Sequence, residues 1–270
     1  MTTKAFDTLR IFLLKEAGIT LRDDQEYQME IRLRPVFTEN NCIDIFSLLT
    51  KATINRELKQ QIVELFTTNE TSFFRDIKVF NFFRTDLFPK LIEANQHRKQ
   101  INILSAASSS GQEAYSLAIT FYDNFPEARD WNIVIQGFDI DSQMVQKARD
   151  GWYSQIEVNR GMPTRSLFKH FEREGRGFRV KDHLKKMVIF RQGNLMEINK
   201  IAGYYNLILC RNVLIYFTDD TQEKVITELA KKLRPSGYFM LGASEIGRRV
   251  PKQYLSHNIK GGVVWYQTTN

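Results

Sequence analysis

The chain has 270 residues, of which 43% are hydrophobic and 26% charged, so its composition is that of an ordinary globular protein. No apolar run approaches the roughly 18 residues that span a bilayer, and the opening segment Met1–Arg10 lacks the apolar core of a signal peptide. The two cysteines, Cys42 and Cys210, offer neither a disulfide framework nor the clustered ligands of a zinc or iron–sulfur site. We therefore expect a cytoplasmic protein with no metal and no membrane insertion.

The positive charge is concentrated in one segment. The whole chain carries a net charge of +7, and residues 160–191 alone carry 10 Lys/Arg against 3 Asp/Glu, whereas residues 1–68 carry 9 against 10. Such a segment attracts an acidic partner, which can be a nucleic acid, an anionic lipid or an acidic protein surface. A solvated basic face is the competing interpretation, and composition does not decide between them.

Two regions follow one another along the chain. Apolar residues recur at helical spacing over the first 68 or so residues, which predicts a small helical bundle. Strands and helices then alternate, as is typical of a Rossmann-like, doubly wound parallel sheet in an α/β protein. The expected strands lie near 101–107, 133–140, 187–190, 207–210 and 238–242, the expected helices near 111–122, 142–149 and 219–233, and a terminal hairpin near 254–267.

Residues 154–186 interrupt this alternation and have no clear period. The predicted organisation is thus an N-terminal helical domain at 1–75 and an α/β domain at 76–270. Residues 154–186 form a small basic insert within the second domain.

Ligands of open α/β sheets bind beyond the carboxyl ends of the strands, so the residues after each strand indicate the ligand. The loop after the first strand, Ser108–Glu113, has a single glycine and matches neither GxGxxG nor a P-loop, which disfavours dinucleotides and nucleoside triphosphates. Glu113 would lie at a helix start, where it either complements the helix dipole or holds a ligand ammonium.

Polar residues also follow the other strands. Asp139 can accept hydrogen bonds from both hydroxyls of a ribose, while Asp141 is better placed as an N-cap. Asn194 can pair with an adenine edge, and Asn212 follows the fourth strand. A nucleoside that lacks a pyrophosphate but carries an ammonium fits these residues, and S-adenosylmethionine is such a ligand.

Five segments, in order and spacing, resemble the CheR family of chemotaxis receptor methyltransferases over essentially the whole chain. They are NETSFFR at 69–75, SAASSSGQEAYS at 105–116, DID at 139–141, CRNVLIYF at 210–217 and LRPSG at 233–237. Gln112 and Ala114 depart from the family's usual GEEPYS, in which an acidic residue and a proline occupy these positions.

The resemblance implies a small all-α domain, a methyltransferase domain and a small β subdomain corresponding to the insert. It also implies the residues of the site. Contacts to S-adenosylmethionine, and to the product S-adenosylhomocysteine, would come from Asn69, Thr71, Arg75, Glu113, Asp139, Asn194, Leu195, Asn212 and Val213. Arg75 and Tyr216 would lie near the transferred methyl group.

The implied reaction is methyl transfer to glutamate side chains on the cytoplasmic helical bundle of chemotaxis receptors, which gives γ-methyl esters in sensory adaptation. The enzyme would be cytoplasmic, and its receptors would bring it to membrane-bound arrays. Glutamate is already ionised at neutral pH, because its ordinary pKa is near 4.3, so no general base is required. The four histidines lie in polar sequence contexts and are expected at the surface.

The basic insert supports two interpretations. In the first, Arg165, Lys169, Arg173, Arg176 and Arg179 form a docking face for the receptor, and no nucleic acid is bound. The alternative is an RNA methyltransferase that uses the insert to bind its substrate. Against it, Arg211–Leu214 contains no Asp/Asn-Pro-Pro-Tyr/Phe motif, and Cys210 lies in an apolar strand, where a nucleophile is poorly placed.

Overall fold

The computed structural model describes residues 3–245, 250–251, 255–260 and 262–268, which form two compact units. The first unit comprises residues 1–68 and 214–222, and the second comprises residues 69–213 and 223–270. The first unit thus ends at Thr68, before the predicted domain boundary at residue 75. None of the described helices is long and apolar enough to cross a membrane.

The first unit is helical. Its elements are α1 (Thr3–Ala17), the 3-10 turn η1 (Asp23–Gln25), α2 (Glu26–Glu39), α3 (Ile45–Ile54), α4 (Arg56–Glu64) and the 3-10 turn η5 (Leu214–Tyr216). Asp44 and Asn55 cap α3 and α4, because each side chain accepts a hydrogen bond from an N–H in the first turn. Fully buried leucines from three helices, including Leu9, Leu33 and Leu48, form the core of this bundle.

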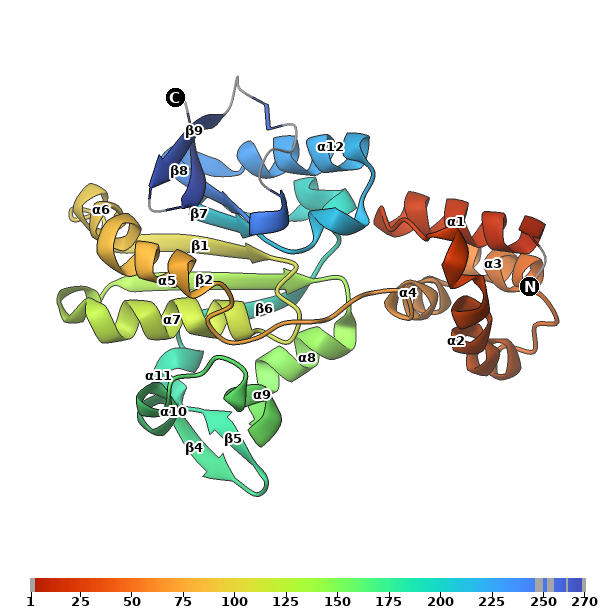
Figure 1. Ribbon diagram of the computed structural model, residues 1–270, viewed down its shortest axis with the longest axis horizontal. Helices are drawn as coiled ribbons and strands as arrows, with labels where there is room; N and C mark the ends of the chain where they lie inside the picture. The colour runs from red at the N-terminus through yellow and green to blue at the C-terminus, as the bar shows by residue number, and fades with distance from the viewer. Residues whose placement is uncertain (1–2, 246–249, 252–254, 261, 269–270) are drawn as a thin grey trace. The chain divides into compact units, whose positions relative to one another are not determined.

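The second unit is built on a seven-stranded sheet in the order β6-β2-β1-β7-β8-β10-β9 (Figure 1). The parallel strands are β1 (Gln100–Ala106), β2 (Asn132–Asp139), β6 (Val188–Gln192), β7 (Tyr205–Cys210) and β8 (Leu233–Leu241). The antiparallel hairpin of β9 (Leu255–Lys260) and β10 (Val263–Thr268) completes the sheet. The predicted α/β class is confirmed; Tyr254 and Gly261 of the predicted hairpin lie outside the described residues.

Helices connect the strands as the alternation predicts. They are α7 (Gln112–Asn124) after β1, the 3-10 turn η3 (Pro126–Ala128), α8 (Ser142–Asp150) after β2, the 3-10 turn η4 (Leu195–Lys200) after β6, α12 (Asp219–Ala230) before β8, and the 3-10 turn η6 (Ala243–Glu245) after it. Asp141 caps α8 by accepting hydrogen bonds from the N–H groups of Gln143 and Met144, which confirms its predicted role.

A phenylalanine-rich stretch precedes the sheet, and sequence analysis assigned it no elements. It forms α5 (Ile77–Phe82), the π-helical turn η2 (Phe83–Leu87) and α6 (Phe88–Ala94). Phe83 and Phe88 stack with ring centroids 5.5 Å apart, and Phe82 lies 4.6 Å from the ring of Trp265 in β10. The stretch therefore belongs to the core of the second unit.

The insert forms a subdomain around a three-stranded antiparallel sheet, β3 (Trp152–Ser154), β5 (Gly177–Val180) and β4 (Phe171–Glu174), in that order. Short helices accompany it: α9 (Gln155–Asn159), α10 (Thr164–His170) and α11 (Asp182–Lys185), the last of which packs on α7 (Figure 1). A two-residue turn, Gly175–Arg176, joins β4 to β5.

One buried histidine in this subdomain corrects an expectation. His170 is completely buried, with Nε2 3.0 Å from Asp123 Oδ1 and Nδ1 2.8 Å from Nε2 of His183. Burial lowers the pKa of His170 despite the neighbouring carboxylate. The polar sequence context predicted a surface histidine, whereas His170 is buried and links the subdomain to the end of α7.

The segment 69–76 is clamped onto the subdomain by Phe73. This fully buried ring meets Tyr153 and Phe171 edge to face, with centroids 5.0 and 5.7 Å away. The backbone of Gly161, at a φ of +93°, approaches so closely that a Cβ there would lie 2.1 Å from the carbonyl oxygen of Phe73.

We expect Gly161→Ala to destabilise the protein by about 3 kcal/mol, because it combines a left-handed backbone with a collision against Phe73. The matched control is Gly175→Ala, at a φ of +60° in open space, which should cost only about 1 kcal/mol. Thermal unfolding measures the loss of stability in both variants, and equal losses would contradict the clamp.

Candidate functional site

The carboxyl ends of β1, β2 and β7 bring the predicted polar residues to one edge of the sheet. β1 pairs with β2 on one side and with β7 on the other, so Ala106, Phe138 and Cys210 lie in register. Asp139 is the last residue of β2, Glu113 follows β1 in the first turn of α7, and Asn212 lies in the loop after β7. Sequence positions up to 100 residues apart thus converge on one edge, as the strand-end argument predicted.

Asp139 ends β2 with both carboxylate oxygens engaged by the backbone. Oδ2 accepts a hydrogen bond from Ser109 N at 2.7 Å, and Oδ1 accepts one from Asp141 N at 3.0 Å. The residue is only 6% exposed. Burial raises the pKa of Asp139 to about 6, although these backbone hydrogen bonds act in the opposite direction. Each oxygen retains lone pairs for a further donor such as a hydroxyl.

Glu113 lies in the first turn of α7, as expected, and its carboxylate is held on two sides. Oε1 accepts a hydrogen bond from Ser105 Oγ at 2.8 Å, and Oε2 accepts one from Arg211 Nη1 at 2.7 Å. Sequence analysis missed Arg211, whose side chain is 1% exposed and whose Nη2 also contacts Asp76 and the carbonyl oxygen of Arg75. The available signal was an arginine directly after an apolar strand.

Segment 69–76 lies against the loop after β1. Asn69 Nδ2 donates to Asp141 Oδ2 at 2.7 Å, and Ser109 Oγ donates to the carbonyl oxygen of Asn69 at 2.9 Å. Arg75 is half-buried, and its Nη1 donates to the carbonyl oxygen of Glu70 at 3.0 Å. Thr71 is also half-buried in this segment.

The remaining expected cofactor residues lie at two loops. Asn194 precedes η4 and caps it, because its side chain accepts a hydrogen bond from Met196 N, and Leu195 is buried beside it. The backbone N–H groups of Asn212 and Val213 both donate to Glu245, at 2.8 Å each. Glu245 is completely buried and also accepts from Gly242 N, and sequence analysis did not identify it.

Tyr216 belongs to the first unit rather than the second. It ends η5, and its carbonyl oxygen accepts hydrogen bonds from the backbone N–H and the hydroxyl of Thr20. Its role near the transferred methyl group stays a prediction.

The donors and acceptors at the sheet edge fit S-adenosylmethionine. Two buried polar atoms there, Ser108 Oγ and Arg211 Nε, lack a hydrogen-bond partner among the described residues. They lie in the loops after β1 and β7, where the polar groups of a ligand can satisfy them. Asp139 and Glu113 supply carboxylate oxygens for hydroxyl and ammonium groups. Cys210 is buried, which raises the pKa of its thiol well above the ordinary value, so it does not act as a thiolate nucleophile.

Comparison with known proteins agrees with this chemistry. A family described as "CheR methyltransferase, SAM binding domain" matches residues 69–260. The chain is 38% identical over 239 residues to a chemotaxis protein methyltransferase of Vibrio parahaemolyticus, covering 87% of this chain and 86% of that one. It is 31% identical over 266 residues to chemotaxis protein methyltransferase 1 of Pseudomonas aeruginosa, covering 96% of both. The chain therefore belongs to the CheR family of S-adenosylmethionine-dependent chemotaxis methyltransferases.

Proposed function

We propose that this enzyme methylates glutamate side chains of chemotaxis receptors, forming γ-methyl esters in sensory adaptation. The observation that carries the proposal is the Arg211 contact, which ties the segment containing Arg75 to the edge where Glu113 lies. That segment can present a substrate carboxylate to a cofactor bound at the same edge. The family membership supports methyl transfer in chemotaxis.

In this proposal each cofactor group has a partner of matching chemistry. Asp139 accepts from the ribose hydroxyls, and Glu113 pairs with the ammonium through the lone pairs that Ser105 and Arg211 leave available. The loop at Asn194 and Leu195 receives the adenine. The remaining contacts come from Asn69, Thr71, Arg75, Asn212 and Val213.

The chain's own residues have to position a nucleophile that is already ionised. S-adenosylmethionine supplies a methyl group on its sulfonium, and a glutamate oxygen takes that methyl group, which leaves S-adenosylhomocysteine and a neutral ester. In-line placement of the two reactants lowers the activation free energy of such reactions by several kcal/mol. Arg75 can hold the carboxylate with its planar guanidinium, and Tyr216 can orient it by a hydrogen bond from its hydroxyl.

The assignment of Asp139 predicts pH-dependent binding. Only the carboxylate accepts from both ribose hydroxyls, so its protonation near pH 6 should raise the Kd of S-adenosylhomocysteine about tenfold between pH 7.5 and 5. Asp139→Asn should weaken binding by about 1–3 kcal/mol at neutral pH and flatten the profile. Titration calorimetry at several pH values measures both effects. A flat wild-type profile, or parallel profiles for the two proteins, would contradict the assignment.

The proposed active site predicts that kcat falls more than cofactor affinity changes in Arg75→Lys and in Tyr216→Phe. The lysine retains charge but not the planar fork, and the phenylalanine retains the ring but not the hydroxyl. Arg98→Lys and Tyr27→Phe change exposed residues in the same way and serve as controls. The assay follows labelled methyl transfer to a receptor cytoplasmic fragment. Normal turnover in both site variants would show that the active site is elsewhere.

The same assay separates the proposed substrate from RNA. A methyl ester releases its label as methanol in mild base, whereas a methylated nucleobase retains it. Base-labile label on the receptor fragment supports the proposal, and stable label on RNA would favour the alternative.

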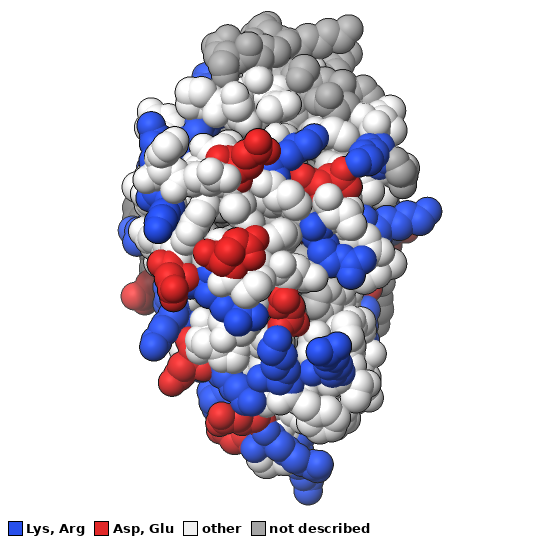
Figure 2. Space-filling view, turned by 90° about the vertical axis from the view of Figure 1, so that its left-hand side faces the viewer, with Lys and Arg blue, Asp and Glu red and all other residues white. Residues whose placement is uncertain are grey.

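We further propose that the basic subdomain docks the enzyme on receptor arrays in the cytoplasm. Figure 2 shows Lys and Arg side chains from the upper to the lower part of one face, including the height at which Figure 1 places the subdomain, with acidic side chains among them. Of the five predicted docking residues, Lys169 pairs with Asp123, and Arg179 pairs with Glu174. Arg165, Arg173 and Arg176 are exposed and supply the charge available to a partner.

Exposed charges act mainly on encounter rates and are screened over about 8 Å at physiological ionic strength. Receptor methylation should therefore fall with added salt through kcat/KM, while the Kd of the cofactor stays constant. Arg173→Glu combined with Arg176→Glu should reproduce that loss at low salt, and Arg98→Glu combined with Lys224→Glu, both at exposed positions outside the subdomain, should not. Measuring kcat/KM over a salt series tests this. A wild-type kcat/KM that does not change with salt would contradict the docking face.

A further inference from the structure

A groove away from the sheet edge that carries Glu113 and Asp139 combines an apolar floor with more cations than carboxylates. It has a volume of about 310 Å³ and lies between α5, the C-terminal half of α7 and the start of α10. Phe74, Ile77, Phe80, Ile119 and Pro163 provide its apolar surface. Ile77 is 56% exposed, although the remainder of its helix is anchored by buried phenylalanines.

The charges of the groove leave a net positive excess. Its lining contains the cations Arg84, Arg165 and Lys169 and one carboxylate, Asp123. Burial by itself would raise the pKa of Asp123, but hydrogen bonds from Lys169 and His170 outweigh it and lower the pKa. Asp123 is therefore already neutralised by Lys169, which leaves two guanidinium groups.

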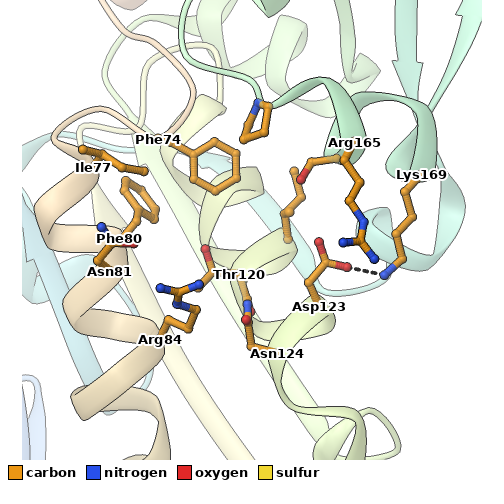
Figure 3. A pocket seen from close by; sticks show the side chains of 13 residues that line it. Phe74, Ile77, Phe80, Asn81, Arg84, Thr120, Asp123, Asn124, Arg165 and Lys169 are labelled. Atoms are coloured by element: carbon orange, nitrogen blue, oxygen red, sulfur yellow. Dashed lines mark hydrogen bonds and ion pairs between the residues drawn. The ribbon is translucent and has the colours of Figure 1, made fainter.

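Those two guanidinium groups face the groove from different elements. Figure 3 shows Arg84 extending from one side and Arg165 from the other, with Thr120 and Asp123 between them. Neither guanidinium has a hydrogen bond or ion pair within the part of the chain that the structure describes. Arg84 projects from the π-helical turn η2, and π-helical turns occur frequently at functional sites.

The open shape of the groove points to a protein rather than a small molecule. Ile77, Asn81, Arg84, Asn124 and Arg165 are all exposed, whereas pockets for small ligands bury roughly 70–90% of the ligand. Guanidinium groups match carboxylates in two-pronged hydrogen bonds, and the apolar floor matches a large side chain between them.

We propose that this groove docks an acidic, amphipathic segment of the receptor, with an apolar side chain on the floor and carboxylates at Arg84 and Arg165. The inference rests on the proposed function, because it takes the methylated receptor as the partner. It adds Arg84 and an apolar floor whose residues, apart from Pro163, lie outside the basic subdomain.

The test measures binding and turnover separately with the full chain. A soluble receptor cytoplasmic fragment is titrated into the enzyme in the presence of S-adenosylhomocysteine, and methyl transfer to the same fragment gives kcat and KM. Arg84→Ala and Ile77→Ser should each raise the Kd and KM for the fragment about fivefold or more. The kcat at saturating fragment and the Kd of the cofactor should change less than twofold.

Two controls match these variants. Lys78→Ala removes an exposed cation from α5, the helix that precedes η2, and Ile156→Ser removes an isoleucine that is 76% exposed, but neither residue lines the groove. Both should bind the fragment like the wild type. Unchanged binding in Arg84→Ala and Ile77→Ser, or equal losses in the controls, would overturn the docking groove.

The outcomes also separate this inference from the proposed function. Groove-dependent binding of the fragment without methyl transfer would overturn the proposed reaction and leave the groove in place. Millimolar succinate, a small dicarboxylate, is added as a competitor. If it removes the difference in Kd for the fragment between Arg84→Ala and the wild type, the groove is a site for small anions, and docking of a protein segment is overturned. Failure of the wild type to bind the fragment would also overturn it.

Discussion

The Arg211 guanidinium joins the loop after β7 to two other parts of the candidate site. It contacts Glu113 at the start of α7 and, from segment 69–76, both Asp76 and the carbonyl oxygen of Arg75. Because the guanidinium is buried, its charge must be matched locally, and removing a partner from a buried pair costs about 3–5 kcal/mol. Glu113 is the more buried partner and contributes more than the half-exposed Asp76. Without this contact the segment that carries Arg75 would lose its fixed place at the sheet edge.

A second buried carboxylate, that of Glu245, fixes the backbone of the loop after β7. Glu245 receives the N–H groups of Asn212, Val213 and Gly242, which fixes the loop although Asn212 adopts a φ of +61°. Backbone donors that would otherwise be unsatisfied are thus paired by a side chain from beyond β8. Two carboxylates, Glu113 and Glu245, flank Cys210, and together with burial they disfavour its ionisation. The same residues that build the loop thus keep this thiol in its protonated form.

Sequence periodicity predicted the central strands β1 and β7 because they are largely buried on both faces and form apolar runs, whereas the edge strand β6 is buried on one face only. It also placed Glu113, Asp139 and Asn212 at one edge, since strand ends in a parallel sheet converge. It did not predict the partners that hold them, because Arg211 and Glu245 meet the site through contacts distant in sequence. His170 shows the same limit: its sequence context is polar, but in space it is completely buried and contacts Asp123 and His183.

Segment 73–76 connects the sheet edge that carries Glu113 and Asp139 with the groove. Phe73 is buried in the subdomain, Phe74 lines the groove, and the carbonyl oxygen of Arg75 accepts from Arg211. Phe74 and Asp76 both adopt positive φ, at 50° and 64°, a conformation that costs non-glycine residues free energy and persists where contacts fix it. A partner bound against Phe74 would therefore touch the residue next to Arg75. Because the segment is clamped by Phe73 and Arg211, such a partner would meet a preformed surface rather than have to order one, and binding there would cost little conformational entropy.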